Sequence, residues 1–290
     1  MKREKVRFRM TKKHTILDHP IIGYFILLIF VMAFSSIGAS LIDGPLSKVI
    51  PGYAKEVSGL GSTVTSASGI GAAIGVLLAV VIFTLWFRPD FKGVLGWKGF
   101  LWGIVAMLPF LIVDYVGAAI DLHTFGFGNV LVAFLSALSP GFTEEVAFRG
   151  LGVANYMRTI KSEKQIKVIF WLSTLLFAGV HITNIFSAGN PVAGILQVVY
   201  CVGVGAIFGA VYLRTANLWV VMIAHFTLDF AGLINGYYSS TGGLSTQVIA
   251  SDWVNLVASA IGIVTALIML SPKHYPQIME LWKEKWSASC

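Results

Sequence analysis

Ionisable side chains are rare inside the long apolar stretches of this sequence, where a charge costs several kcal/mol and usually serves a function. A carboxylate beside imidazoles can activate a water molecule and stabilise the oxyanion that forms when the water attacks an amide carbonyl. The same set offers nitrogen and oxygen ligands to a divalent metal such as zinc, and the sequence leaves open whether one binds. Hydrolysis is the reaction class that these residues indicate. They are Asp114, Glu144, Glu145, Arg149, His181, His225 and Asp229.

Two adjacent carboxylates, Glu144 and Glu145, follow a Pro140-Gly141 pair that we expect to loosen the helix and open a wet pocket. Arg149 comes four residues after Glu145, a spacing that places both side chains on one helix face as an ion pair. Glu144 is turned by about 100° from that face and has no local cation. We therefore expect Glu144 to be the carboxylate available for chemistry, with Glu145 and Arg149 in support.

Histidines occur in two further apolar stretches. Phe177 precedes His181 by one helical turn, which makes the aromatic ring a supporting neighbour. His225 and Asp229 are four residues apart, so an imidazole and a carboxylate share one face. That spacing suits a shared water molecule or a shared metal ion. The metal candidates are accordingly Glu144, His181, His225 and Asp229.

Depth in the bilayer gives an independent reason to group these side chains. At about 1.5 Å of rise per residue, counted from the nearest basic segment, four of them lie roughly 16 to 23 Å from the inner boundary. Because they belong to three different helices, a shared level predicts a common site. The four are Glu144, His181, His225 and Asp229.

The elements that must position this site are membrane-spanning helices. Apolar residues make up 56% of the 290-residue chain, charged residues only 12%, and the mean hydropathy is +0.79. Stretches of about 20 apolar residues, enough to cross a bilayer, recur along the chain. We predict an all-α polytopic bundle with eight transmembrane helices, near residues 20–42, 66–87, 99–120, 128–157, 168–187, 191–213, 215–235 and 249–271.

Positive charge predicts how these helices are oriented. Lys and Arg concentrate in alternate connections, whereas those near 121–127, 188–190 and 236–248 contain none. Since cytoplasmic loops hold the excess of basic residues, both termini are predicted to be cytoplasmic. The net charge of +7 then reflects topology and lipid headgroups, and a nucleic-acid partner is excluded.

A single membrane-embedded domain is expected over residues 1–290, since no connection is long enough for a soluble domain. Residues 1–19 form a basic cytoplasmic segment, and residues 272–290 a cytoplasmic tail that we interpret as an interfacial helix. Glycine pairs at 71/75 and 205/209 predict close helix packing. Asp114 is expected to give structural support, and Cys201 and Cys290 support no disulfide or cysteine metal site.

Three motifs in order resemble those of the CAAX protease and bacteriocin-processing group (CPBP, or Abi), which includes type II CAAX prenyl endopeptidases. Glu144-Glu145-x-x-x-Arg149 is similar to its E-E-x-x-x-R motif, Phe177-x-x-x-His181 to its F-x-x-x-H motif, and His225-x-x-x-Asp229 to its H-x-x-x-N or D motif. The resemblance covers about residues 130–235, and we place the catalytic core at 128–235.

The resemblance implies an intramembrane endopeptidase that cleaves a membrane-associated peptide or protein. Glu144 would activate water with help from His181, while His225 and Asp229 would position the water, bind a metal or stabilise the oxyanion. Asp229 stands where the prenyl-protein enzymes have Asn, which favours a bacterial membrane, with peptide or bacteriocin processing or bacteriocin immunity as the biology.

Two other functions fit the same residues. Buried acids and histidines also form the ion pathways of transporters, although no second half of this chain repeats the Pro140-Gly141 break. A non-catalytic immunity or scaffold protein that binds a partner through its membrane face is the other alternative.

Overall fold

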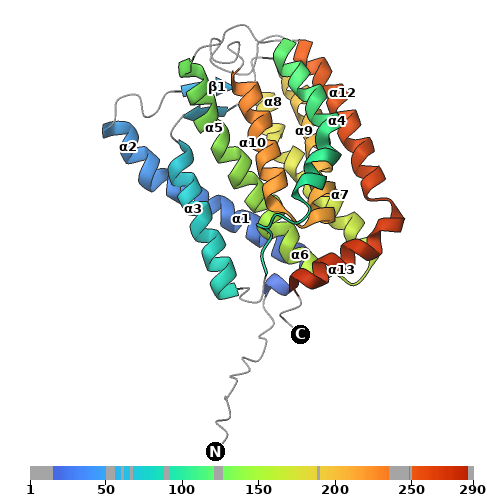
Figure 1. The fold of residues 1–290 in the computed structure, drawn as a ribbon. Helices are drawn as coiled ribbons and strands as arrows, with labels where there is room; N and C mark the ends of the chain where they lie inside the picture. Colours follow the sequence, from blue (N-terminus) through green and yellow to red (C-terminus); the bar gives the residue numbers. More distant parts are fainter. Residues whose placement is uncertain are drawn as a thin grey trace, which may run out of the picture.

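The computed structural model describes residues 16–49, 56–59, 62–65, 68–87, 92–120, 127–187, 190–234, 248 and 250–286. Most of these residues are helical (Figure 1). The α-helices are α1 (Pro20–Gly38), α2 (Gly44–Val49), α3 (Ser68–Ile82), α4 (Phe100–Ile120), α5 (Phe127–Glu145), α6 (Ala154–Arg158), α7 (Glu163–Gly179), α8 (Asn184–Ser187), α9 (Pro191–Thr215), α10 (Leu218–Ile234), α12 (Ala250–Met269) and α13 (Tyr275–Trp286).

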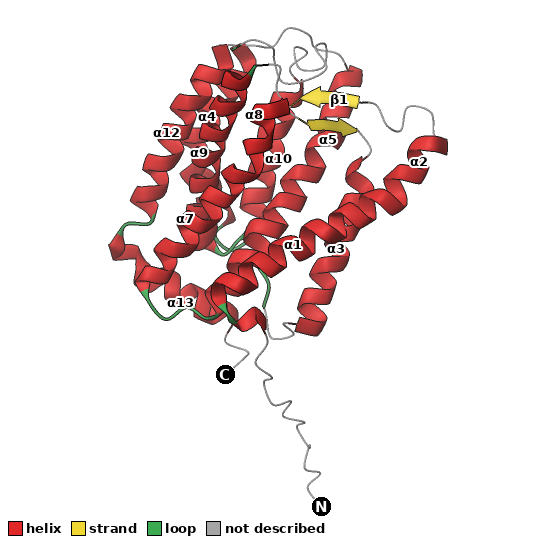
Figure 2. Ribbon diagram, turned by 180° about the vertical axis from the view of Figure 1, so that it is seen from behind, coloured by secondary structure: helices red, strands yellow, loops and turns green. Residues whose placement is uncertain are grey.

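Shorter elements join or extend these helices. Wider π-helical turns are η2 (Ala39–Asp43), η3 (Phe83–Phe87) and η4 (Val146–Val153), and 3-10 turns are η1 (Ile16–Asp18), η5 (Val180–Thr183) and η6 (Pro272–His274). Strands β1 (Glu56–Gly59) and β2 (Ser62–Thr65) pair antiparallel between α2 and α3 (Figure 2). This small hairpin holds the only strands among the described residues.

The helical polytopic bundle predicted from composition is confirmed. Each of the eight predicted stretches coincides with a helix, and six helices of the described chain are long and apolar enough to cross a membrane. Leu218–Gly232 of α10 is a shorter apolar helix. The stretch from α5 through α6 is not among the six, and it carries Glu144, Glu145 and Arg149, whose charges lower its hydropathy.

Helix α9 forms the centre of the bundle. It packs against α12, α7, α4 and α10, and nearly every residue between Cys201 and Thr215 is buried. Helix α10 in turn packs against α5 and α4, while α1 and α3 pair at the side (Figures 1 and 2). Helices α7 and α10 therefore contact this buried helix directly, and α5 packs against α10.

Glycines allow the close approach of α1 and α3. A Cβ atom added to Gly71 would overlap the carbonyl oxygen of Gly38, and one added to Gly75 would overlap that of Phe34. The close packing predicted for Gly71 and Gly75 is present. At Gly205 an added Cβ would lie 3.1 Å from the carbonyl oxygen of Thr174, but at Gly209 the nearest atom would be at 3.6 Å, an ordinary contact.

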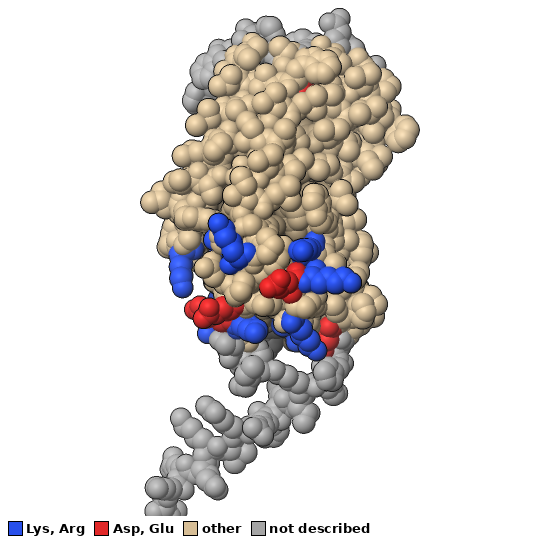
Figure 3. Space-filling view, turned by 90° about the vertical axis from the view of Figure 1, so that its right-hand side faces the viewer, with Lys and Arg blue, Asp and Glu red and all other residues tan. Residues whose placement is uncertain are grey.

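The basic segments meet at one end of the bundle, where Figure 3 shows Lys and Arg side chains gathered. Arg158 pairs with Asp18, and the backbone nitrogen of Lys92 donates to the carbonyl oxygen of Lys285 over 3.1 Å. These contacts tie the start of α1 to α6, and the segment before α4 to α13. The arrangement fits the predicted topology, whose sidedness stays a prediction; residues 1–15 and Arg88 lie outside the described residues.

The C-terminal tail is a helix whose apolar stripe packs against the bundle, and its place at the membrane interface stays a prediction. Ile278, Trp282 and Trp286 are at most 5% exposed and pack against the bundle. Trp282 Nε1 donates to the Leu213 carbonyl oxygen over 3.0 Å, and Trp286 Nε1 to that of Ala154 over 3.1 Å. The spacing of four residues places the stripe on one face, and the two indole donors secure that face to α9 and α6.

Replacing Gly75 by Ala is expected to lower the free energy of unfolding by about 1–3 kcal/mol, because the methyl group would force α1 and α3 apart. Gly209→Ala is the matched control, since its methyl group meets only ordinary contacts. Unfolding of both variants by titration with sodium dodecyl sulfate measures the difference. Equal stability of the two variants would contradict the packing described here.

Candidate active site

The Glu145 carboxylate joins two helices at the centre of the site. Its Oε1 accepts hydrogen bonds from Arg149 Nη1 over 2.8 Å and from His225 Nδ1 over 2.9 Å. Both Glu145 and Arg149 are fully buried. The ion pair predicted from the four-residue spacing is present, and the histidine adds a link from α5 to α10 that spacing within one helix does not indicate.

Aromatic rings enclose the Arg149 guanidinium. Its central carbon lies 4.4 Å from the ring centroid of Phe177, 5.7 Å from that of Phe148 and 6.0 Å from that of Phe208. A desolvated cation is attracted to the negative faces of such rings. Since the surroundings are apolar and offer few other polar partners, Arg149 is suited to holding Glu145 in place.

Phe177 lies between the two histidines. Its ring centroid is 5.4 Å from that of His181 and 5.7 Å from that of His225. Helix α7 ends at Gly179, and His181 lies on the 3-10 turn that follows. Residues of η4, of the 3-10 turn after α7 and of α10 thus meet around one ring, and the common site predicted from depth stays a prediction.

The hydrogen bond of His181 fixes its tautomer. Nδ1 lies 2.9 Å from the carbonyl oxygen of Phe177. A carbonyl oxygen can only accept, so Nδ1 carries the proton and Nε2 of the neutral ring carries the lone pair. His181 is therefore arranged to accept a proton at Nε2.

His225 lies between two carboxylates. Its Nδ1 faces Glu145, and its Nε2 lies 3.5 Å from Asp229 Oδ2. Because the Glu145 oxygen accepts, Nδ1 is the donor, and a neutral ring would direct its Nε2 lone pair at Asp229. A favourable contact requires one more proton, carried either by the ring as an imidazolium or by the Asp229 carboxyl.

Glu144 is held differently from its neighbour. The residue is half-buried, its Oε2 atom is inaccessible to solvent, and that atom has no hydrogen bond to any described residue. Glu144 nevertheless interacts electrostatically with His225 and Asp229. A buried carboxylate oxygen requires a polar partner, and a water molecule or a substrate group can supply one. Glu144 is thus an acid near His225 with an unused acceptor, a property that it shares with Glu145 Oε2 and Asp229 Oδ2, but it accepts no hydrogen bond from Arg149 or His225.

The local structure before and after the two acids differs from the expectation. Helix α5 continues through Pro140 and Gly141 to Glu145, so the predicted break at this pair is wrong. Gly141 instead lets α10 approach, since a Cβ atom there would lie 2.8 Å from the backbone nitrogen of Phe226. The irregularity follows the acids, in the π-helical turn η4, and such turns are frequent at functional sites.

Helix α9 contributes neighbours that sequence reasoning missed. Tyr200 donates a hydrogen bond to buried Asp114, in agreement with the structural role expected for that acid. Phe208 packs against the ring of His225 at a centroid distance of 5.8 Å. Neither aromatic residue differs in type from the ordinary packing residues of a membrane helix, so no pattern in the sequence could have indicated them.

The described residues do not form a recognisable metal centre. Within that part of the chain no three His, Cys, Asp or Glu side chains are grouped closely enough to hold a metal ion. Glu144, His181, His225 and Asp229 therefore stay candidates by residue type, and a divalent metal stays a prediction.

One comparison with known proteins matches this region. Residues 126–231 match the family model described as type II CAAX prenyl endopeptidase Rce1-like. The matched region is just over a third of the chain and includes Glu144, Glu145, Arg149, Phe177, His181, His225 and Asp229. No curated protein and no solved structure matches the chain.

Replacing Arg149 by Met is expected to lower the free energy of unfolding by about 3–5 kcal/mol, because it leaves the buried Glu145 without its cation. The double variant Glu145→Gln/Arg149→Met removes both charges and should recover part of that loss. Unfolding by detergent titration measures all three proteins. A single variant as stable as the double variant would contradict the charge argument.

Proposed function

We propose, on the premise that residues 126–231 match the type II CAAX prenyl endopeptidase Rce1-like family model, that this protein is an intramembrane endopeptidase with Glu144 as its general base. The observation that carries the proposal is the contrast between two adjacent acids. Glu145 accepts hydrogen bonds from Arg149 and His225 at Oε1 and has only its Oε2 without a partner, whereas neither of these side chains donates to Glu144, whose buried Oε2 has no hydrogen bond to any described residue. A general base needs such an available oxygen.

The proposed reaction begins with removal of a proton from water. Glu144 takes this proton as the water oxygen attacks the carbonyl carbon of the scissile peptide bond, and His181 accepts a hydrogen bond from the same water at Nε2. The carbonyl oxygen becomes an oxyanion. Glu144 then returns the proton to the amide nitrogen, the carbon–nitrogen bond breaks, and an amine and a carboxylic acid leave.

His225 is the group that we assign to the oxyanion. With Nδ1 fixed on Glu145, an imidazolium presents Nε2–H on the side of Asp229, and a pre-oriented donor of this kind stabilises the developing negative charge. In the resting site the Nε2–H of His225 faces the Asp229 carboxylate, whose Oδ2 lies 3.5 Å from Nε2. Glu145 and Arg149 position His225 and do not contact the substrate.

The proposed substrate is a membrane-associated peptide or protein. The site is surrounded by helices of the bundle, so a substrate anchored in the bilayer reaches it more readily than a soluble one. A carboxylate at Asp229 rather than an amide separates this chain from the prenyl-protein pattern and favours peptide or bacteriocin processing in a bacterial membrane. The transporter and immunity alternatives predict no cleavage at all.

Glu144→Gln should reduce the rate of peptide cleavage by about 10²- to 10⁴-fold, the usual contribution of a general base. The amide has nearly the same shape, and Glu144 Oε2 has no protein hydrogen bond to lose, so folding should persist. Glu163→Gln, at an exposed acid of α7, is the matched control.

Purified protein in lipid vesicles would be offered prenylated and unmodified membrane-anchored peptides, with products identified by mass spectrometry. Cleavage by Glu144→Gln at the wild-type rate would disprove the assignment. A wild-type protein that cleaves none of these peptides, but moves ions or solutes in a Glu144-dependent way, would favour the transporter.

Chelation tests the metal question separately. Because no step of the proposed reaction requires a metal, activity should persist after treatment with EDTA, with less than one metal ion per protein in the same sample. Activity that is lost on chelation and restored by zinc alone would contradict the metal-free reaction and make the four candidate residues ligands.

A further inference from the structure

An apolar cavity lies away from the candidate active site. This groove, which we call the α3–α10 groove, has a volume of about 580 Å³ and lies between α3, α5 with η4, and α10. Its walls are apolar, with side chains that include Leu77, Val80, Leu95, Phe142, Leu151 and Trp219. None of the candidate catalytic residues lines it. Phe142 is turned by about 200° around α5 from Glu144, so the groove and the active site use opposite faces of that helix.

The length of the groove matches one leaflet of a bilayer. Its lining follows α3 from Ala73 to Thr84, which corresponds to about 16 Å at the rise of an α-helix. Half of a hydrocarbon core is about 15 Å. Leu77 and Leu95 line the groove and are 64% and 55% exposed, so it is open at the side. An acyl chain from the surrounding leaflet can therefore enter laterally.

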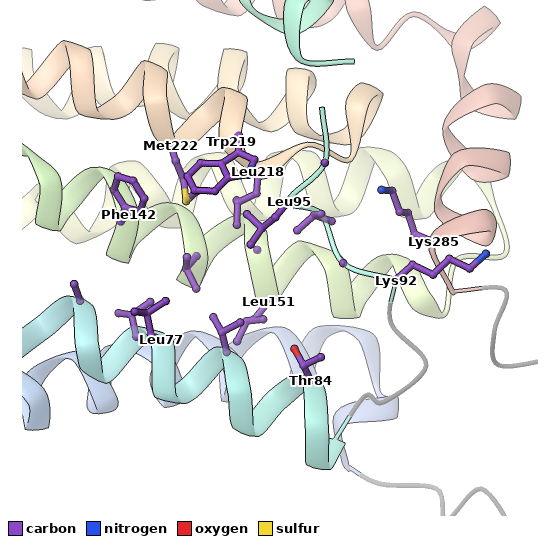
Figure 4. A pocket seen from close by; sticks show the side chains of 18 of the residues that line it. Leu77, Thr84, Lys92, Leu95, Phe142, Leu151, Leu218, Trp219, Met222 and Lys285 are labelled. Atoms are coloured by element: carbon purple, nitrogen blue, oxygen red, sulfur yellow. The ribbon is translucent and has the colours of Figure 1, made fainter. Parts of the chain in front are cut away.

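Two lysines lie at one end of the groove. Figure 4 shows Lys92 and Lys285 at this end, near Thr84, with Phe142 and Met222 farther along. The end belongs to the basic face of the molecule, where headgroups would lie under the predicted topology. Basic pockets between membrane helices at this level bind anionic headgroups.

Lys285 lies near one acid and two further lysines. Burial lowers the pKa of its ammonium, Glu284 opposes this effect, and Lys98 and Lys92 lower the pKa further by a smaller amount. The backbone hydrogen bond from Lys92 to Lys285 holds the two segments together. Such an arrangement favours a bound anion, which would offset the repulsion between the ammonium groups.

We propose that the α3–α10 groove binds one anionic phospholipid, with an acyl chain along α3 and the headgroup phosphate at Lys92 and Lys285. The apolar walls, the length of one leaflet and the cationic end together match this class of molecule. A second protein copy would not require the lysines, and a zwitterionic lipid would gain less from them. The proposal is independent of the catalytic assignment.

Native mass spectrometry of delipidated protein, titrated with phosphatidylglycerol or phosphatidylcholine in detergent, tests it. Wild type should retain phosphatidylglycerol in preference, and Lys92→Ala and Lys285→Ala should each weaken that binding about fivefold, as expected for one basic residue. Lys273→Ala is the matched control, because this exposed lysine of the same end does not line the groove. Leu77→Trp should displace the lipid by filling the groove while leaving the lysines in place.

Several results would overturn the proposal. One is equal retention of the two lipids by wild type, which would show that the groove does not distinguish an anionic headgroup from a zwitterionic one. Others are phosphatidylglycerol binding that falls equally in Lys273→Ala, or that survives Leu77→Trp unchanged. A dimer that Leu77→Trp dissociates, without any lipid adduct in wild type, would assign the groove to a second copy.

Discussion

The Glu145 carboxylate, buried without any exposure to solvent, sets the arrangement of the other polar groups. Removing a charge from water is costly, and the cost is offset only where every nearby partner is correctly placed. Arg149 supplies the opposite charge, three aromatic rings enclose that cation, and His225 supplies a second donor from another helix. Any shift of α10 relative to α5 would break this network and leave a buried charge without its partners. Because such a charge is costly in an apolar interior, the network holds the two helices in one relative position.

The geometry of one helix separates the roles of two adjacent acids. Successive side chains on a helix point about 100° apart. When Glu145 points toward Arg149 and His225, Glu144 therefore points away from them. Glu144 keeps an oxygen without a protein hydrogen bond, while its neighbours position His225. The family match over residues 126–231 includes both acids, and the matched family model describes an endopeptidase. Peptide-bond hydrolysis, with Glu144 as the base, is the function that we propose for this site.

Much of this arrangement follows from patterns within single helices. Apolar length located the helices, the spacing of Glu145 and Arg149 predicted their pairing, and depth grouped residues of three helices. Contacts between helices could not be obtained in this way. The link from His225 to Glu145 and the packing of Phe208 depend on which helices are neighbours. An apolar stripe such as that of α13 has the same sequence pattern whether it contacts lipid or protein. Pro140 suggested a break because its missing N–H weakens a helix, yet packing against α10 keeps α5 continuous.

Chemical rescue would examine the assignment of Glu144 most directly. In Glu144→Ala the side-chain carboxylate is removed, and added formate can take its place beside the histidines. The cleavage rate of this variant should rise with formate concentration, whereas Glu145→Ala should gain nothing, since a small diffusing anion cannot restore the fixed link between Arg149 and His225. Two results would contradict the role of Glu144 as the base. One is cleavage by Glu144→Ala at the wild-type rate without formate, and the other is rescue by formate of Glu145→Ala but not of Glu144→Ala.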